Sequence, residues 1–346
     1  MTPELPAVDI HLVSWNSLTH LPSCFESFRH QTHRPISVMV VDNGSVDGTV
    51  DWIQENQPHI SLLRNTRNLG FSQAHNQALR ITTAPYVLVV NPDIYLAPDW
   101  LSRGVQFLQQ HPSYASYGGK LLRYSYSSDE LKEIVKTDII DSAGLDGNRA
   151  RHFHDRGSGQ PDRGQFNQSG QVFGLSGACV LLRRRALESI TAQHEYYDED
   201  IFAYKEDVDL AWRLQRLGWL AHYDANNIAY HFRTIQGQSQ RGNLVLARHY
   251  RQRASWQARL SYRNHWLLHA KHEQRATWWR DGWWIGWYEC KKFIYLLCRQ
   301  PTALRGFTQA LKLWPRFRIK AQWLNQQSHR TALEISYQWF HHEHPA

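Results

Sequence analysis

The sequence contains little cysteine, with four residues in 346 and no Cys-x-x-Cys pair. This scarcity excludes a zinc-finger framework and a dense disulfide scaffold, and it favours a reducing compartment. No basic segment followed by an apolar stretch opens the chain, so no signal peptide is predicted. No run of about 18 apolar residues occurs, and no membrane-spanning helix is expected. We therefore expect a cytoplasmic protein.

Several phosphate-binding and hydrolase motifs are also missing. No G-x-x-x-x-G-K-[ST] loop is present, and Ser14-Trp15-Asn16 follows the first apolar run in place of G-x-G-x-x-G. No G-x-S-x-G elbow occurs either. P-loop kinases, dinucleotide oxidoreductases and α/β-hydrolases thereby lose their main support.

Aromatic and basic residues are abundant instead. There are 15 Trp and 16 Tyr, and 39 Lys and Arg against 31 Asp and Glu give a formal net charge of +8. This charge favours polyanionic partners, among them nucleic acid, anionic lipid and phosphorylated substrates, and does not choose among them. The length suits one large α/β domain, alone or with an appendage.

Short apolar runs alternate with helical patterns in the amino-terminal part. Strands are predicted at residues 8–15, 36–41, 60–63 and 86–90, with helices after the first and third. Because each strand is nearly all apolar, the pattern indicates a parallel sheet covered on both faces. Ligands of such sheets bind beyond the carboxyl ends of the strands, where polar residues gather in this sequence.

The rest of the chain divides by composition. Residues 124–170 are polar with little periodicity, which is typical of a mobile functional loop or insertion. Apolar patterns return at 172–182 and in a helix at 208–217, and near residue 240 Trp, Lys and Arg begin to dominate. We predict a domain of residues 1–240 and a helical region of residues 241–346.

Two carboxylates follow predicted strands directly. Asp93, in Asn91-Pro92-Asp93, could hold Mg²⁺, which needs one or two carboxylates plus substrate phosphates, although the tripeptide alone favours an ordinary turn. Asp42, beside Asn43, could accept hydrogen bonds from a ribose or a base. The next polar residues, Ser45 and Asp47, suit helix capping equally well.

Three further residues have the character of site residues. Glu206 and Asp207 begin a predicted helix, where acids commonly serve the helix dipole but could also supply a general base. His231 follows a short apolar run; a lone histidine is more often structural, yet imidazole can bind a metal or a phosphate.

Three other histidines have metal-ligand spacing on a predicted helix. His265 and His269 are four residues apart, and His269 and His272 are three apart. They lack the adjacent acid of an H-E-x-x-H motif, so we expect them at the surface or facing a membrane.

These stretches together resemble the family 2 glycosyltransferases, especially bacterial rhamnosyltransferases of cell-surface polysaccharide synthesis. The resemblance covers roughly residues 8 to 270. The matching segments, in chain order, are residues 13–16, 40–48, 65–76 (NTRNLGFSQAHN), 91–93 (NPD), 141–144 (DSAG), 174–183 and 197–213 (YDEDIFAYKEDVDLAWR).

The resemblance implies a GT-A fold with a mostly parallel central sheet, and an inverting transfer from a nucleoside-diphosphate sugar to an acceptor hydroxyl. It implies dTDP-rhamnose as the first donor to consider, a UDP-hexose as the next, and a glycan or lipid-linked acceptor. The residues it assigns to the nucleotide-sugar site are Ser14, Trp15, Asn16, Asp42, Asn43, Asn68, Gly70, Asn91 and Gly177.

The resemblance also implies roles for the acidic residues. Asp93 would bind a divalent metal, Mg²⁺ or Mn²⁺, with His231 near the metal or the diphosphate. Asp207 would be the general base, with Glu206 as the alternative. Asn91 stands where many GT-A enzymes carry the first Asp of D-x-D, which leaves Asp93 as the single firm carboxylate.

An apolar stripe is predicted in the carboxyl-terminal region. Ten Lys and Arg but only two acids lie between residues 274 and 325. Positions that fall on one helix face are Trp279, Trp283, Trp287, Cys290, Ile294 and Leu297. Such a helix suits either an anionic membrane surface or packing on its own domain, and the sequence favours neither.

Other functions remain to be compared with a glycosyltransferase. A nucleotidyltransferase would need a basic glycine-rich loop after the first strand, which residues 14–16 do not supply. An inactive nucleotide-sugar-binding module is disfavoured by the presence of both Asp93 and Asp207. Nucleic-acid binding through the basic, aromatic tail lacks any recognisable motif, so no nucleic-acid partner is expected.

Overall fold

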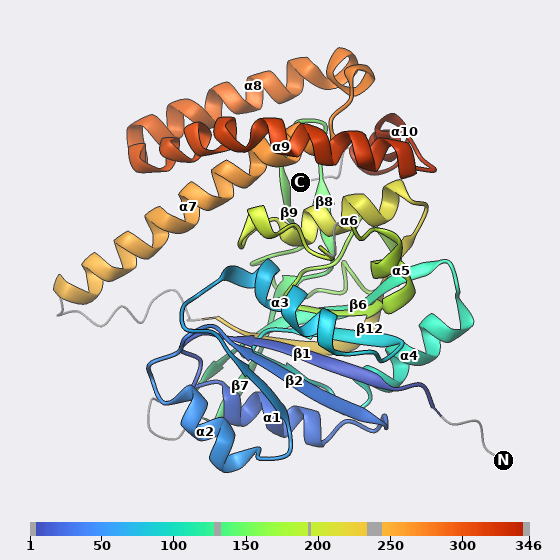
Figure 1. The fold of residues 1–346 in the computed structure, drawn as a ribbon, viewed down its shortest axis with the longest axis vertical. Helices are drawn as coiled ribbons and strands as arrows, with labels where there is room; N and C mark the ends of the chain where they lie inside the picture. The colour runs from blue at the N-terminus through green and yellow to red at the C-terminus, as the bar shows by residue number, and fades with distance from the viewer. Residues whose placement is uncertain (1–4, 128–132, 193–194, 234–243, 342–346) are drawn as a thin grey trace.

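A computed structural model describes residues 5–127, 133–192, 195–233 and 244–341. Within these residues, ten strands form one mixed sheet in the order β10-β12-β6-β11-β4-β1-β2-β3, with β5 added to β12 and β7 to β6. Helices cover the sheet, and a separate group of long helices lies beyond one end of it (Figure 1). The expected α/β class and GT-A-like layout are confirmed.

The amino-terminal half of the sheet is parallel, as predicted. Its strands are β1 (Val8–Ser14), β2 (Ile36–Asp42), β3 (Ser61–Arg64) and β4 (Tyr86–Val90). Their helices are α1 (Leu21–Arg29), α2 (Thr49–Asn56), α3 (Gly70–Ile81) and, after β5 (Ile94–Leu96), α4 (Trp100–Gln110). Because helices pack on both faces of the sheet at β1 and β4, the side chains of these strands are almost completely buried, which explains the continuous apolar runs.

The second half of the sheet is mostly antiparallel. It contains β6 (Tyr114–Tyr126), β7 (Ile134–Ser142), β10 (Gly170–Val172), β11 (Cys179–Arg183) and β12 (Leu220–Phe232). Its helices are α5 (Arg184–Ser189), the 3₁₀ turn η1 (Glu199–Ile201) and α6 (Glu206–Arg216). Strand β11 runs antiparallel between β4 and β6 and thereby carries the segment before it to the end of β4.

Residues 124–170 contain more regular structure than their polar composition indicates. Besides β7, they include the two-stranded sheet of β8 (Leu145–Gly147) and β9 (Phe153–Asp155). These strands are too short to produce a periodic pattern, so the sequence indicated only a loop. Residues 128–132 lie outside the described residues, and the mobility of this segment stays a prediction.

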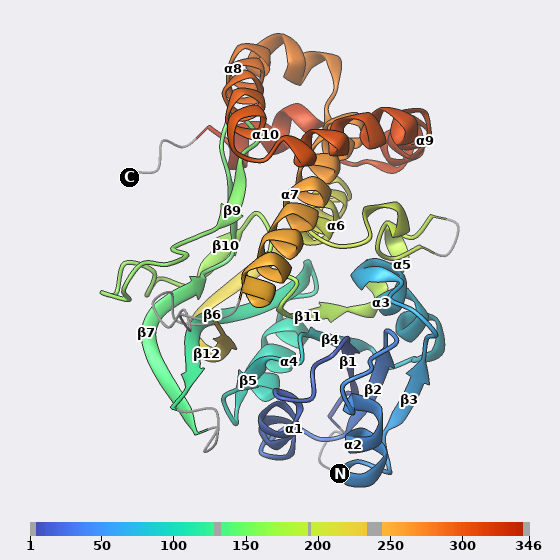
Figure 2. The same ribbon diagram turned by 90° about the vertical axis from the view of Figure 1, so that its left-hand side faces the viewer.

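The carboxyl-terminal region is helical, as expected. It comprises α7 (Leu244–His272), α8 (Arg275–Arg299), the 3₁₀ turn η2 (Pro301–Leu304), α9 (Arg305–Gln327) and α10 (Ala332–Trp339). Helix α7 runs from beside the sheet up to the other three helices (Figure 2). The predicted boundary at residues 240 and 241 lies outside the described residues.

Buried polar contacts attach this region to the α/β domain. Asn264 on α7 donates to the backbone carbonyls of Ile201, Ala203 and Tyr204 at 2.7–2.9 Å. Lys271, also on α7, lies 2.8 Å from Asp209 on α6 in an almost fully buried ion pair. Since such groups are costly to bury unpaired, these contacts specify one position of α7 on the domain.

The apolar stripe of α8 is exposed. Trp279 and Trp283 expose 90% and 75% of their surface, and Trp287, Ile294 and Leu297 each expose more than half. The stripe therefore does not pack on the chain's own described residues. No helix in the described part of the chain has the length and apolarity needed to cross a membrane.

The three histidines expected at the surface are buried, so that expectation was wrong. His265, His269 and His272 expose at most 3% of their surface. Their helix, α7, packs against the α/β domain on one side and other helices on the other, and it has no free face along this stretch. The nearby residues that accompany them come from other helices, which sequence spacing does not reveal.

Candidate functional site

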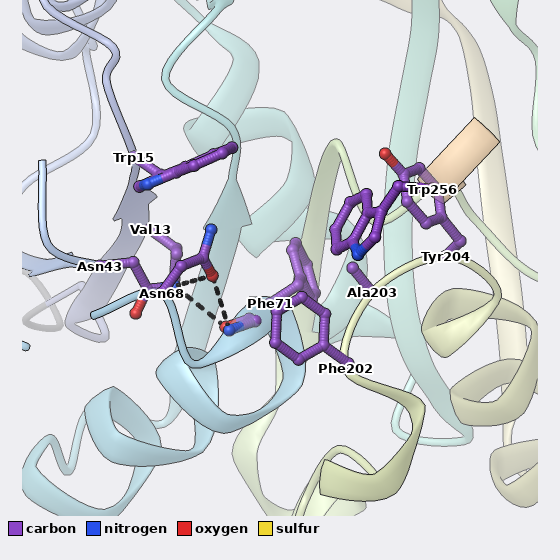
Figure 3. A pocket seen from close by; sticks show the side chains of 10 residues that line it. Val13, Trp15, Asn43, Asn68, Phe71, Phe202, Ala203, Tyr204 and Trp256 are labelled. Carbon is purple, nitrogen blue, oxygen red and sulfur yellow. Dashed lines mark hydrogen bonds between the residues drawn. The ribbon is translucent and has the colours of Figure 1, made fainter. Parts of the chain in front are cut away.

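A cavity of about 600 Å³ lies beside the carboxyl ends of β1 and β2. Four residues predicted to bind a nucleotide sugar line it, namely Trp15, Asn43, Asn68 and Gly70 (Figure 3). The residues that complete its wall are Val13, Phe71, Phe202, Ala203, Tyr204 and Trp256. This position agrees with the expectation that ligands bind beyond the strand ends.

The floor of the cavity is held by two asparagines. Asn43 donates to the carbonyl of Gly70 at 3.1 Å, and Asn68 Oδ1 accepts the Gly70 N–H at 2.8 Å. Gly70 has φ +88, and a Cβ there would lie 2.6 Å from the carbonyl oxygen of Phe202. Only glycine lets the start of α3 approach that segment so closely.

Three predicted nucleotide-binding residues lie next to the cavity without lining it. Asp42 accepts the backbone N–H groups of Gly44 and Ser45 at 3.1 and 3.0 Å, and its second oxygen is buried without a hydrogen bond. Ser14, paired with Asp42 in the sheet, is also fully buried. Asn16 accepts the Val46 N–H at 2.9 Å and shapes the turn.

The cavity has an aromatic wall, of which only Trp15 was predicted from the sequence. Trp15 exposes 49% of its surface at one side, and Trp256 lies across from it (Figure 3). Trp256 belongs to α7 and contacts the rings of Phe202 and Tyr204 at centroid distances of 5.8 and 6.1 Å. The carboxyl-terminal region therefore builds part of this site.

Asp93 and His231, the two residues that the resemblance assigns to a metal site, lie side by side. His231 Nε2 is 3.2 Å from Asp93 Oδ1, and His231 Nδ1 is 2.7 Å from Asp141 Oδ2. Asp141 also accepts hydrogen bonds from Arg233 at 3.0 Å and Arg123 at 3.3 Å. Asp141 belongs to the DSAG segment of the resemblance, but nothing in the sequence indicated that it orients His231.

The electrostatics of this group fit a divalent cation. Burial lowers the pKa of His231, but Asp93 and Asp141 outweigh that effect and raise the pKa to about 9. Burial raises the pKa of Asp93, yet His231 opposes it and leaves the pKa below its usual value. Asp93 Oδ1 is buried without a well-directed hydrogen bond. A cation could therefore replace the imidazole proton between these atoms.

Glu206 and Asp207 open α6 behind a strained segment. Phe202, Tyr204 and Lys205 have φ between +66 and +70, values that non-glycine residues rarely adopt. Such strain persists where the surrounding structure enforces it, commonly at functional sites. Residues 202–204 of this segment line the cavity, and Glu206 and Asp207 follow the segment directly.

The two acids share an environment that favours a proton. Burial is the main cause that raises the pKa of Glu206 to about 8, and the charge of the neighbouring Asp207 contributes to the same shift. Burial also raises the pKa of Asp207, although the N–H groups of Gly177 and Val208 oppose this shift. Glu206 Oε2 has no hydrogen-bond partner. A carboxyl group with a raised pKa is suited to act as a general base near neutral pH.

The two residues before β11, Gly177 and Ala178, contact the segments of both predicted catalytic centres. The Gly177 N–H lies 3.3 Å from Asp207 Oδ2, and the Asn91 N–H donates to the next carbonyl, that of Ala178, at 2.9 Å. Asn91 begins the turn that ends at Asp93. The turn that ends at Asp93 and the start of α6 that carries Asp207 therefore both contact residues 177 and 178.

A third acid lies in the same region and was not predicted. Burial is the main cause that raises the pKa of Asp155 to about 6. The charges of Asp207 and Asp141 act in the same direction. Asp155 Oδ1 is buried without a hydrogen bond. Asp155 lies on β9, inside the segment whose polar composition concealed its strands.

The sequence matches a family profile and several curated proteins. The profile described as glycosyl transferase family 2 matches residues 9–191. An N-acetylglucosaminyl-diphospho-decaprenol L-rhamnosyltransferase of Mycobacterium tuberculosis is 29% identical over 242 residues, which is 64% of this chain and 74% of that protein. A chondroitin synthase of Escherichia coli is 31% identical over 99 residues, 28% of this chain and 14% of that protein.

Solved structures share the fold. GalNAc-T7, crystallised with UDP, GalNAc and Mn²⁺, superposes with a TM-score of 0.59 at 11% identity, covering 79% of this chain and 49% of that one. A mannosyltransferase of Pyrobaculum calidifontis in complex with GDP-Man and Mn²⁺ gives 0.51 at 16% identity, covering 96% and 87%. At these identities the likeness concerns the fold alone.

Proposed function

The chain belongs to glycosyl transferase family 2 and is a glycosyltransferase that uses a nucleotide-sugar donor, and we propose that it transfers the sugar to an acceptor hydroxyl with inversion at the anomeric carbon. The observation that supports this proposal is that residues 177 and 178, just before β11, contact both Asp207 and the turn that ends at Asp93. An inverting transfer needs charge stabilisation at the leaving group and a base on the opposite face of the sugar.

The cavity between Trp15 and Trp256 is the proposed donor site. Its aromatic walls suit a nucleoside base, and Asn43 and Asn68 form its polar floor. dTDP-rhamnose is the first donor to test because the mycobacterial relative is named as an L-rhamnosyltransferase. A UDP-hexose is the second. Asp42 and Ser14 support the cavity from below.

Asp93 and His231 are the proposed metal ligands. Bound Mg²⁺ or Mn²⁺ would neutralise the charge that develops on the leaving nucleoside diphosphate. Asp141 holds the His231 ring so that Nε2 faces Asp93. Because Asn91 replaces the first acid of D-x-D, one carboxylate and one imidazole carry the cation, and Asp141 supports the imidazole.

Asp207 is the proposed general base. Its carboxylate is fixed by N–H donors from Gly177 and Val208 at the start of a helix, which restricts its orientation. The proton of the acceptor hydroxyl passes to Asp207 as the oxygen attacks the anomeric carbon. Glu206 is the alternative base, since its pKa is also raised and one of its oxygens is unpaired.

A lipid-linked acceptor is proposed, with the enzyme at the cytoplasmic face of a membrane. The mycobacterial relative is named for a diphospho-decaprenol acceptor. The exposed tryptophans of α8 form an apolar surface, and basic residues accompany them, with Lys291 Nζ 5.7 Å from the centroid of the Trp287 ring. Such a surface suits the interface of an anionic bilayer.

A panel of nucleotide sugars tests the activity. With Mn²⁺ or Mg²⁺ present, release of free nucleoside diphosphate from one donor is expected, and it should rise when a polyprenyl-diphosphate sugar is added as acceptor. A nucleotidyltransferase would instead release pyrophosphate from a nucleoside triphosphate and a sugar phosphate. Donor binding without any turnover would indicate an inactive binding module.

A further inference from the structure

A second group of potential metal ligands lies away from the donor cavity, between α7 and α8. His265 and His269 project from successive turns of α7, and Glu289 comes from α8. One ligand atom from each lies within 4.8 Å of the others. All three side chains are buried, with exposed fractions of 2%, 3% and 7%. The group therefore joins two helices of the carboxyl-terminal region.

The contacts within this group exceed what hydrogen bonds can satisfy. His265 Nε2 lies 2.6 Å from Glu289 Oε1 and also 3.2 Å from His269 Nε2. A ring nitrogen carries either one proton or one lone pair in the ring plane, so it forms one well-directed hydrogen bond at a time. If His265 Nε2 donates to Glu289, it has no lone pair for His269, and if it accepts from His269, it has no proton for Glu289.

A cation placed among the three atoms removes this conflict. All three can then act as lone-pair donors at once. In tetrahedral zinc sites a Zn–N distance of about 2.0 Å implies about 3.3 Å between two ligand nitrogens, close to the 3.2 Å between His265 and His269. The 2.6 Å between His265 Nε2 and Glu289 Oε1 is shorter than this geometry allows, so the carboxylate would have to move away from the ring when the ion binds. The second carboxylate oxygen of Glu289 is buried without a hydrogen bond and remains free to bind the same ion.

Two lysines compete with a cation for the charge of Glu289. Lys205 and Lys292 both act on its carboxyl group electrostatically, but neither forms an ion pair with it within 4.0 Å in the described part of the chain. Burial lowers the pKa of Lys292 to about 8, and its Nζ lies over the rings of Tyr262 and Tyr288. No lysine of the described residues therefore holds the Glu289 carboxylate, which faces the two histidines.

We propose that His265, His269 and Glu289 bind one divalent transition-metal ion, with Zn²⁺ as the preferred ion, and that this ion fastens α8 to α7. Two imidazoles and one carboxylate form a ligand set that zinc accepts with a water molecule in the fourth position. The site is separate from Asp93 and His231. It would fix the helix that carries Trp256 and the helix that carries the exposed tryptophans.

The test measures metal content rather than activity, so it is independent of the proposed function. The full chain, without a histidine tag, carries Asp93→Asn to weaken the other candidate site, and is stripped with chelator and refilled with Co²⁺. We expect about one Co²⁺ per chain, with the visible absorption of a tetrahedral ion, displaced by Zn²⁺. A rise in Tm with Zn²⁺ is expected as well.

Substitutions at the group assign the ion. His269→Ala should abolish the Co²⁺ spectrum, and Glu289→Gln, which keeps the size of the side chain, should weaken Co²⁺ binding about 10-fold or more. His329→Ala, at an exposed histidine, is the matched control and should leave binding unchanged. Absence of the spectrum in the parent protein, or its persistence in Glu289→Gln and His269→Ala, would overturn the proposal. If His269→Ala fails to fold, Glu289→Gln decides.

Discussion

The imidazole of His231 is fixed by the carboxylate of Asp141, whose Oδ2 lies 2.7 Å from Nδ1. This contact leaves His231 Nε2 directed at Asp93, 3.2 Å away. A carboxylate behind a metal-binding imidazole sets the orientation of the ring and its basicity. The relationship makes Asp141 a positioning residue for the proposed metal site.

Asp141→Asn should therefore weaken metal binding without removing a ligand. Loss of such a partner lowers metal affinity about 10- to 100-fold, so the Mn²⁺ concentration for half-maximal activity should rise by that factor while turnover at saturating Mn²⁺ changes less. Asp138→Asn, at an exposed position of the same strand, is the control. Equal Mn²⁺ dependence in both variants would contradict the role of Asp141.

Asp207→Asn should reduce turnover about 10²- to 10⁴-fold, the usual contribution of a general base. Donor affinity should remain nearly unchanged because Asp207 lies outside the walls of the donor cavity. Turnover and donor Kd measured side by side check this. Glu206→Gln provides the comparison: full activity in Asp207→Asn with a large loss in Glu206→Gln would transfer the role of base to Glu206.

The raised pKa values predict opposite effects of pH on activity and stability. Since the base must be unprotonated and burial raises the pKa of Asp207, activity should fall as pH decreases, at a higher pH than an ordinary aspartate would give. The pKa of Glu206 is about 8 in the folded chain and near its ordinary value of 4.5 in the unfolded chain, so the folded state binds more protons between these values. Stability from this group is therefore present at low pH and is lost as pH rises.

Thermal unfolding of the metal-free protein measures the second effect. Between about pH 5 and pH 8 Glu206 lowers the Tm progressively as pH rises, so the Tm of Glu206→Gln should rise relative to wild type across this range because the amide cannot ionise. A matched change at an exposed acid, Glu188→Gln, should leave the dependence of Tm on pH as it is in wild type. A wild-type dependence that survives Glu206→Gln would place the titrating group elsewhere.

Replacing Trp279, Trp283 and Trp287 by serine should abolish binding to vesicles that contain phosphatidylglycerol. These side chains are exposed, so the Tm should change little. Co-sedimentation with anionic and with zwitterionic vesicles measures the apolar and charge contributions. Ile81→Ser with Val135→Ser, two exposed apolar positions on the α/β domain, is the control. Undiminished sedimentation of the triple variant would reject the membrane surface.

The sequence was most informative where the chain has continuous buried segments. Strand β4 occupies residues 86–90 as predicted, and residues 177 and 178 contact both Asp207 and the turn that ends at Asp93. Asp155 and Trp256 escaped prediction because they reach the site through tertiary packing, without a local motif. Glu289 likewise follows His265 by 24 residues and joins it only because α8 folds back beside α7.

The presence of Trp256 in the donor cavity limits how this enzyme can be recombined with its relatives. A chimera joined between residues 234 and 243 would take its whole helical region from the relative. Its α7 would then replace Trp256 in the wall of the proposed donor cavity with the residue of the relative. Donor selectivity in such hybrids should therefore not follow the α/β half alone. A junction placed after α7 would keep all residues that line the cavity from one parent enzyme.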